Sequence, residues 1–229
     1  MIIAILGNIG SGKSVYATKL AIESDYHCFI NFKIKARGIT RLKKEHIVRE
    51  DVIGENRNGK ALTKKVVNWD YWNEQLKKYG NYHLFLDEIH NLIHSRRSMS
   101  NWNVLCTMWI SQIRKILGDK EDTHIFMISQ RLQRIDVAFR DLLHMIVACQ
   151  KFETTKKFKT RVVENGRYTF KMLPLVFILQ YHFKGEACKE KYLLWMNGSK
   201  TFDYKTVFIA NPYFQYYDSY EIFGETAYV

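Results

Sequence analysis

The feature that most constrains this sequence is a glycine-rich stretch near its start that matches the pattern GxxxxGK[ST] in full. An apolar run, Ile2 to Leu6, precedes the stretch and predicts a strand buried on both faces of a parallel sheet. A helix is expected from about Lys13 to Glu23. In this setting the pattern forms a phosphate-binding loop, whose residues here are Gly7, Asn8, Ile9, Gly10, Ser11, Gly12, Lys13 and Ser14.

The chemistry of such a loop predicts ATP as the ligand and Mg²⁺ as its companion. Glycines let the backbone curl around phosphate oxygens and point N–H groups at them. Lys13 is expected to reach the β and γ phosphates, and the Ser14 hydroxyl to coordinate Mg²⁺. The start of the helix adds a favourable field for an anion. The alternative, a glycine turn that binds nothing, is disfavoured by the complete pattern in its required setting.

Two carboxylates follow a second apolar strand and supply the other half of a nucleotide site. Asp87 and Glu88 come directly after the expected strand Tyr82 to Leu86, at the end where ligands bind in open α/β sheets. Asp87 is expected to hold Mg²⁺, directly or through a water, and Glu88 to orient and polarise the attacking water. The alternative is that both residues only cap a helix.

Further polar residues near these segments are candidates with weaker patterns. Gln130 ends the expected strand Thr123 to Ser129 and is a candidate sensor of the γ-phosphate, or else an ordinary amide at a strand end. His90 and His94 have the spacing of metal ligands, but without a third ligand we favour solvent or structural roles. Several arginines are able to neutralise transition-state charge in their own or a neighbouring subunit: Arg96, Arg97, Arg114, Arg131, Arg134 and Arg140.

The order of the expected elements predicts an α/β fold with a mainly parallel central sheet flanked by helices. The stretch Lys33 to Lys65 is read mainly as an excursion and loop. After Lys151 the pattern changes to polar–apolar alternation around an Asn165–Gly166 turn, which predicts antiparallel hairpins. The other expected elements are strands at Tyr26 to Phe32 and His144 to Cys149, and helices at Trp69 to Lys78, Trp102 to Gly118 and Ile135 to Leu142. We therefore divide the chain into a P-loop core, 1–150, and a β-rich extension packed on it, 151–229.

Composition adds expectations about partners and compartment. The formal net charge is +12, from 35 basic and 23 acidic residues, and favours a polyanion such as nucleic acid over an acidic partner, with a solvated basic surface as the alternative. The four cysteines are far apart and lack the spacing of a zinc site or a secreted disulfide scaffold, which indicates a reducing, intracellular compartment. No stretch approaches the roughly 20 apolar residues that a membrane-spanning helix needs.

The glycine loop, the Asp87–Glu88 pair and the strand ending in Gln130 follow one another in a recognisable order. Together they resemble the additional-strand, catalytic-glutamate branch of P-loop ATPases, and specifically the FtsK/HerA superfamily. Within it, residues 1–150 are similar to Zot-like viral ATPases and to genome-packaging ATPases of membrane-containing viruses. The phrases that carry this resemblance are Phe29 to Phe32, Leu86 to Asn91, Gln112 to Lys115, Ser129–Gln130, Ile135–Asp136, Phe139–Arg140 and, more weakly, Tyr217 to Glu221.

The resemblance implies a catalytic set of Lys13, Glu88, Gln130, Arg114 and Arg140, in which Gln130 is the sensor and the two arginines are candidates for an arginine finger. It implies a homo-oligomeric ring, a hexamer, that moves double-stranded DNA and meets a virion or capsid protein. The leading hypothesis is an ATP-driven DNA translocase that packages a viral genome, acting in the host cytoplasm or at the virion. The alternatives are a Zot-like ATPase for assembly or extrusion of a filamentous virion, a nucleotide-dependent assembly switch, and a small-metabolite kinase.

Overall fold

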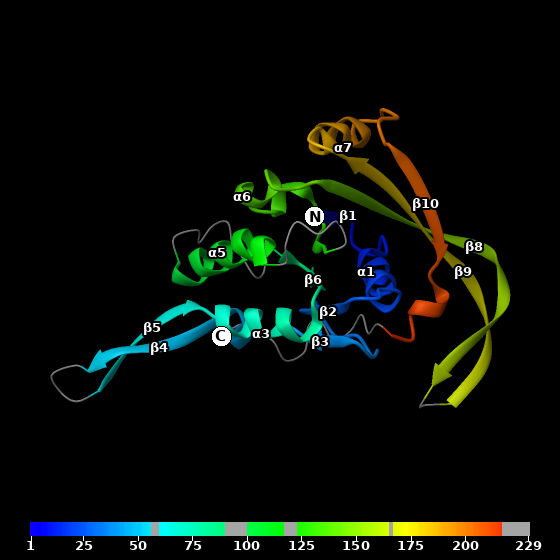
Figure 1. The fold of residues 1–229 in the computed structure, drawn as a ribbon. Helices are drawn as coiled ribbons and strands as arrows, with labels where there is room; N and C mark the ends of the chain where they lie inside the picture. The colour runs from blue at the N-terminus through cyan, green and yellow to red at the C-terminus, as the bar shows by residue number, and fades with distance from the viewer. Residues whose placement is uncertain (56–59, 90–99, 117–122, 165–166, 217–229) are drawn as a thin grey trace.

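An eight-stranded sheet organises the part of the chain that the computed structural model describes, residues 1–55, 60–89, 100–116, 123–164 and 167–216 (Figure 1). Its strands are β1 (Ile2–Leu6), β2 (His27–Ile30), β3 (Ile39–Arg41), β6 (Tyr82–Leu86), β7 (Ile125–Ser129), β8 (Met145–Glu164), β9 (Arg167–Lys184) and β10 (Tyr204–Ile209). They lie in the order β10-β9-β8-β1-β7-β6-β2-β3.

The sheet is parallel from β8 to β3 and becomes antiparallel at β9 and β10. β7 lies between β1 and β6, so an additional strand separates the strand of the glycine loop from the strand of the Asp–Glu pair. Every residue of β1, β6 and β7 is buried, as expected for strands covered on both faces. The predicted fold class, a mainly parallel sheet with antiparallel strands toward the C-terminus, is confirmed.

Helices cover both faces of the sheet. On one face α1 (Lys13–Ile22) packs with the side chains of Ile3 and Ile5, and the short helix η3 (Asn211–Tyr213) follows on the same side. The opposite face carries Ile2, Ala4 and Leu6 of the same strand, because side chains alternate along it. The helices packed there are α3 (Trp69–Tyr79), α5 (Asn101–Ile116), α6 (Val137–Arg140) and α7 (Cys188–Met196), with η2 (Leu132–Arg134) between β7 and α6.

The prediction that Lys33 to Lys65 is mainly loop is wrong. This stretch contains β3, a short helix α2 (Lys44–Ile47) and a separate antiparallel hairpin of β4 (Val48–Glu55) and β5 (Ala61–Val67). The hairpin is exposed along most of its length, so its strands lack the apolar alternation that marks a half-buried strand. The predicted strand His144 to Cys149 continues without a break to Glu164 as β8, whose outer part pairs with β9 in the antiparallel hairpin expected after Lys151.

The boundary that we predict between residues 150 and 151 falls inside β8, and β9 and β10 extend the sheet of the core. The two parts of the chain therefore share one sheet, and the division into core and extension stays a prediction. The Asn165–Gly166 turn lies outside the described residues, although the paired residues Glu164 and Arg167 bracket it.

The four cysteines are buried and form no disulfide. Among the helices that the structure describes, none combines the length and the apolar character that crossing a membrane requires.

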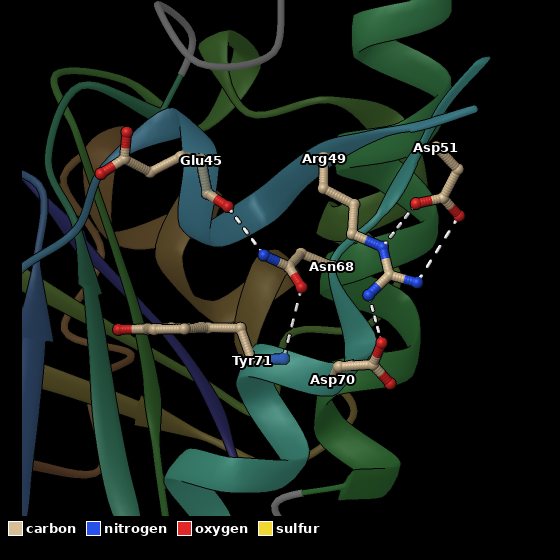
Figure 2. Close-up of polar contacts among 6 residues, drawn as sticks. All are labelled: Glu45, Arg49, Asp51, Asn68, Asp70 and Tyr71. Carbon is tan, nitrogen blue, oxygen red and sulfur yellow. Dashed lines mark hydrogen bonds and ion pairs between the residues drawn. The ribbon is translucent and has the colours of Figure 1, made fainter. Parts of the chain in front are cut away.

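A polar junction ties α2 to the start of α3, beside the base of the β4–β5 hairpin (Figure 2). Asn68 is the N-cap of α3, and its side-chain oxygen accepts a hydrogen bond from the Tyr71 N–H at 3.3 Å. The amide nitrogen of the same side chain donates to the main-chain oxygen of Glu45 in α2, at 2.9 Å. One side chain therefore caps a helix and holds the neighbouring one against it.

Arg49 completes the junction from β4. Its guanidinium contacts Asp51 on the same strand, with Nε 2.8 Å from Oδ1, and also contacts Asp70 in the first turn of α3 (Figure 2). Because these groups are exposed, we assign them a positional role rather than a large share of stability. The hairpin thereby leaves the body of the molecule at a defined place, at the left of Figure 1.

We predict that Asn68→Ala lowers the free energy of unfolding by about 1 kcal/mol, because the cap of α3 is lost. Urea denaturation measures this change, provided that the dependence of the unfolding free energy on urea concentration is the same in both proteins. Asn68→Asp is the matched control: it keeps the acceptor for Tyr71 but cannot donate to Glu45, so it should lose less. Equal stability of wild type and Asn68→Ala would contradict the capping role.

Candidate nucleotide-binding and catalytic site

The candidate residues gather at one edge of the sheet because parallel strands end there together. The glycine loop follows β1, Asp87 and Glu88 follow β6, and Gln130 follows β7. This is the carboxyl edge at which open α/β sheets bind their ligands. The three sequence patterns, far apart along the chain, thus meet on adjacent strands.

The glycine loop has a backbone that other residues would strain or block. Gly7, Gly10 and Gly12 have φ angles of 152°, 75° and 88°. A Cβ on Gly7 would lie 2.7 Å from the main-chain oxygen of Cys149, and a Cβ on Gly12 would lie 2.2 Å from Cδ1 of Ile178. The loop is therefore closely packed from behind by β8 and β9, while a Cβ on Gly10 would meet nothing within 4 Å.

Lys13 and the start of α1 provide positive charge within this loop. The Lys13 side chain is buried, and its ammonium donates to the main-chain oxygen of Asn8 at 3.0 Å. Burial lowers the pKa of Lys13, and the nearby carboxylates of Glu88 and Asp87 act in the opposite direction. Gly12 is the N-cap of α1 and has no side chain to satisfy the first N–H groups, and the first turn holds no acidic residue. Both features suit an anion.

Ser14 and Asp87, the two predicted Mg²⁺ ligands, are already in contact. The Ser14 hydroxyl on α1 donates to Oδ2 of Asp87 at 3.0 Å. The other carboxylate oxygen of Asp87 accepts the Glu88 N–H at 2.9 Å. An oxygen pair at this separation matches the preference of Mg²⁺ for a small number of hard oxygen ligands.

Asp87 is held in a surrounding that opposes its ionisation. Burial, followed by the neighbouring charge of Glu88, raises its pKa from an ordinary value of 3.8 to about 6, although Ser14, the Glu88 N–H and Lys13 act in the opposite direction. A divalent cation at this carboxylate would favour the ionised form. Burial of Asp87 therefore raises its pKa in the nucleotide-free protein, and a bound cation would counteract this effect.

Glu88 has a backbone conformation that is unusual for a residue with a side chain. Its φ angle is 46°, in the left-handed region, which costs on the order of 1 kcal/mol. Such outliers concentrate at functional sites. The conformation turns the chain sharply after β6, and Oε1 of Glu88 accepts a hydrogen bond from the Gln130 side chain at 3.3 Å. The two predicted residues are thus brought together, while their chemical roles remain predictions.

Asn31 belongs to the site although the sequence analysis gave it no role. Its side chain makes two hydrogen bonds to the main chain of Asp87: the amide nitrogen donates to the Asp87 oxygen at 2.8 Å, and the side-chain oxygen accepts the Asp87 N–H at 2.7 Å. Asn31 follows β2, which pairs with β6. It is therefore a positioning residue that fixes where the carboxylate pair leaves the sheet. The available signal was a lone asparagine after an apolar strand.

Of the two arginines that the resemblance places in the catalytic set, only Arg140 has a described side chain, and it does not join this cluster. Arg114 lies on α5, and its side chain is outside the described part of the chain. Arg140 ends α6 and makes no hydrogen bond or ion pair with the cluster, and its Nε is buried without a hydrogen-bond partner among the described residues. His90, His94, Arg96, Arg97 and the Tyr217 to Glu221 stretch lie outside the described residues.

These residues fit a nucleoside triphosphate with Mg²⁺. The loop leaves N–H groups and one buried ammonium for phosphate oxygens, and the hydroxyl of Ser11 is buried without a hydrogen-bond partner among the described residues. The Ser14–Asp87 pair supplies oxygen ligands beside the loop. The additional strand between β1 and β6 completes the arrangement. The fold is that of a P-loop NTPase.

Several solved structures are similar to this chain at low sequence identity and with TM-scores below 0.5. The N-terminal domain of zonular occludens toxin from Neisseria meningitidis is 13% identical, with 95% of this chain and 98% of that chain covered and a TM-score of 0.44. The DNA-packaging ATPase B204 from Sulfolobus turreted icosahedral virus is 15% identical, with 64% and 74% covered and a TM-score of 0.38. The packaging NTPase B204 from Sulfolobus turreted icosahedral virus 2, in complex with ATPγS, is 12% identical, with 81% and 93% covered and a TM-score of 0.41. No protein-family model and no curated protein matches the chain.

We predict that the contribution of Asp87 to the stability of the nucleotide-free protein falls as pH rises from about 4 to about 6, because the folded state keeps a proton on Asp87 that the unfolded state releases earlier. Asp87→Asn removes this effect, and at pH 7 should be more stable than wild type by up to about 3 kcal/mol. Urea unfolding in EDTA at pH values between 4 and 8 measures the difference between the two proteins. A difference that does not grow with pH over this range would contradict the raised pKa.

Proposed function

We propose that this protein is an ATP-driven DNA translocase, and specifically a viral genome-packaging motor that hydrolyses ATP with Mg²⁺. The observation that carries the proposal is the joint placement of Ser14 against Asp87, at 3.0 Å, and of Gln130 against Glu88, at 3.3 Å. These contacts connect the glycine loop to the ends of two neighbouring strands. A loop that only bound phosphate would have no need for a second carboxylate in a strained conformation beside it.

In this proposal each residue of the cluster has one task. Lys13 and the N–H groups of the loop bind the phosphates, and Ser14 and Asp87 hold the metal ion. Mg²⁺, when bound, neutralises charge that develops on the phosphate oxygens. Glu88 orients and polarises the attacking water, and Gln130, hydrogen-bonded to Glu88, reports whether the γ-phosphate is present. Asn31 keeps the carboxylate pair in place through the main chain of Asp87.

The DNA partner is inferred from charge and from the sequence resemblance. A net charge of +12 exceeds what one nucleotide requires and suits the phosphate backbone of double-stranded DNA. Movement along DNA implies that several subunits surround it, and we propose a homo-oligomeric ring, a hexamer. In such a ring Arg114 or Arg140 would complete the site of the neighbouring subunit.

We predict that double-stranded DNA stimulates the ATPase activity of the wild-type protein. Glu88→Gln should keep nucleotide affinity while turnover falls on the order of 10²-fold or more, because water is no longer activated. Lys13→Ala should lose nucleotide binding itself, because the cation that contacts the β and γ phosphates is gone. Steady-state ATPase assays and titration with a fluorescent ATP analogue separate these effects. If neither double- nor single-stranded DNA stimulates the ATPase activity, a nucleotide-dependent assembly switch becomes the better account.

The ring makes a separate prediction about shared active sites. Arg140→Ala, or Arg114→Ala, should abolish hydrolysis and leave ATP binding nearly intact, because the charge is needed mainly in the transition state. Mixing the inactive arginine variant with Glu88→Gln should restore partial activity, since some mixed interfaces then contain one intact Glu88 and one intact arginine. Failure of every mixture, or full activity of a monomer with ATP and DNA present, would exclude the ring.

A further inference from the structure

The outer part of the β8–β9 hairpin, residues 154–161 and 168–175, forms a two-stranded ribbon that we call the distal ribbon. Only residues Met145–Ala148 of β8 pair with β1, and only residues 177–182 of β9 pair with β10. Beyond these limits the two strands pair with each other, and the ribbon extends to the right of the sheet in Figure 1. A strand pair of this length, mostly exposed, contributes no buried core of its own.

One face of the distal ribbon carries alternating cations and large apolar side chains. In the antiparallel register Lys159 lies opposite Met172, and Arg161 lies opposite Phe170, so their side chains share a face. Tyr168 and Phe170 are each 63% exposed, and Met172 is 59% exposed. The members of this face, called the basic face below, are Lys157, Lys159, Arg161, Tyr168, Phe170 and Met172.

The rings of the basic face hold its cations in place. Cζ of Arg161 lies 3.5 Å from the ring centroid of Tyr168, and Nζ of Lys159 lies 4.9 Å from the centroid of Phe170. A guanidinium stacked on a ring has one flat side covered, while the N–H groups at its edge stay available for a bidentate contact. This arrangement suits a phosphate, because planar N–H pairs match its oxygens.

The sequence of the distal ribbon is basic. Residues 154–161 and 168–175 include the cations of the basic face, Lys157, Lys159 and Arg161, and they include neither aspartate nor glutamate. The neighbouring Glu153 is paired with Lys151, 2.6 Å from its Nζ. The ribbon is therefore a strip of positive charge that extends away from the body, and a polyanion is the complementary partner.

We propose that the basic face of the distal ribbon binds the phosphate backbone of double-stranded DNA. A two-stranded ribbon has the width that the major groove accommodates, and Lys157, Lys159 and Arg161 are spaced along it to contact successive phosphates. The identity of the polyanion rests on the proposed function, whereas the position of the contact rests on the charge and geometry of the ribbon.

β9, the strand that carries the apolar side chains of the basic face, also reaches the glycine loop. Side chains alternate along β9, so Tyr168, Phe170 and Met172 lie on the same face of the strand as Ile178. Ile178 is the side chain that a Cβ on Gly12 would meet at 2.2 Å. β9 therefore connects the site of DNA contact on the ribbon directly to the glycine loop. We infer that β9 transmits the effect of bound DNA to the loop and so stimulates ATP turnover.

The test replaces Lys157, Lys159 and Arg161 by Gln in the full chain and measures binding to a 30-base-pair duplex by fluorescence anisotropy at several salt concentrations. The matched control removes the same charge elsewhere with Lys64→Gln, Lys65→Gln and Lys77→Gln, on β5 and α3.

We expect the ribbon variant to bind DNA on the order of 10- to 100-fold more weakly than wild type. The slope of log binding constant against log salt concentration should be smaller in magnitude by about three, and the control should resemble wild type. Both variants should keep wild-type ATPase activity without DNA, and the ribbon variant should lose its stimulation. Arg161→Lys, which keeps the charge but not the planar stack, should lose less.

The possible outcomes distinguish a failure of the ribbon proposal from a failure of the proposed function. If the ribbon variant binds DNA as wild type does while DNA still stimulates hydrolysis, the ribbon proposal is wrong and the motor proposal stands. If wild type neither binds duplex DNA nor is stimulated by it, both proposals fail. Ribbon-dependent binding of polyglutamate or of phosphatidylserine vesicles, at an affinity equal to or above that for the duplex, would overturn the assignment to DNA in favour of an acidic protein or a membrane surface.

Discussion

The hydrogen bond from the Ser14 hydroxyl to the Asp87 carboxylate is the contact on which the rest of this site depends. It connects α1, which directly follows the glycine loop, to the end of β6, although 73 positions separate the two residues in the sequence. The connection exists because β1, β7 and β6 are parallel and end at one edge. The sheet therefore brings together the two oxygen atoms that we propose as Mg²⁺ ligands, and Asn31 fixes the second of them from the neighbouring strand.

The cost of this arrangement is concentrated in two adjacent residues. Asp87 is buried with a pKa raised to about 6, and Glu88 adopts a φ angle of 46°. Neither feature stabilises the fold, since one opposes ionisation and the other opposes the backbone preference of a residue with a Cβ. The apolar strands around them provide the stability that tolerates both, which is the usual relation between a core and its functional site.

The local patterns predicted the buried parallel strands and the position of the glycine loop well, because each depends on residues close together in the sequence. The run Ile2 to Leu6 and the glycines after it specify their own conformation, and the strand at Tyr82 to Leu86 was expected with the bounds observed. The β8–β9 hairpin was expected from the alternation after Lys151, but the β4–β5 hairpin could not be predicted in this way. The residues of β4 and β5 are mostly exposed, so the sequence carries no alternation of apolar and polar residues there, and only the pairing of the two strands defines them. Asn31 was missed for a related reason: its partner is the main chain of Asp87, which has no sequence signature.

The contact between Gly12 and Ile178 has a consequence for the order in which the protein is assembled. The glycine loop precedes β9 in the chain and is synthesised before it, yet the side chain that lies behind the loop belongs to β9, and β1 itself pairs with β7 and β8. The most local and recognisable motif in the sequence therefore acquires its final packing only after β9 has been synthesised. Nucleotide binding would then report the completion of the whole sheet, and a nascent chain that stops before β9 would carry an intact motif without the packing behind it.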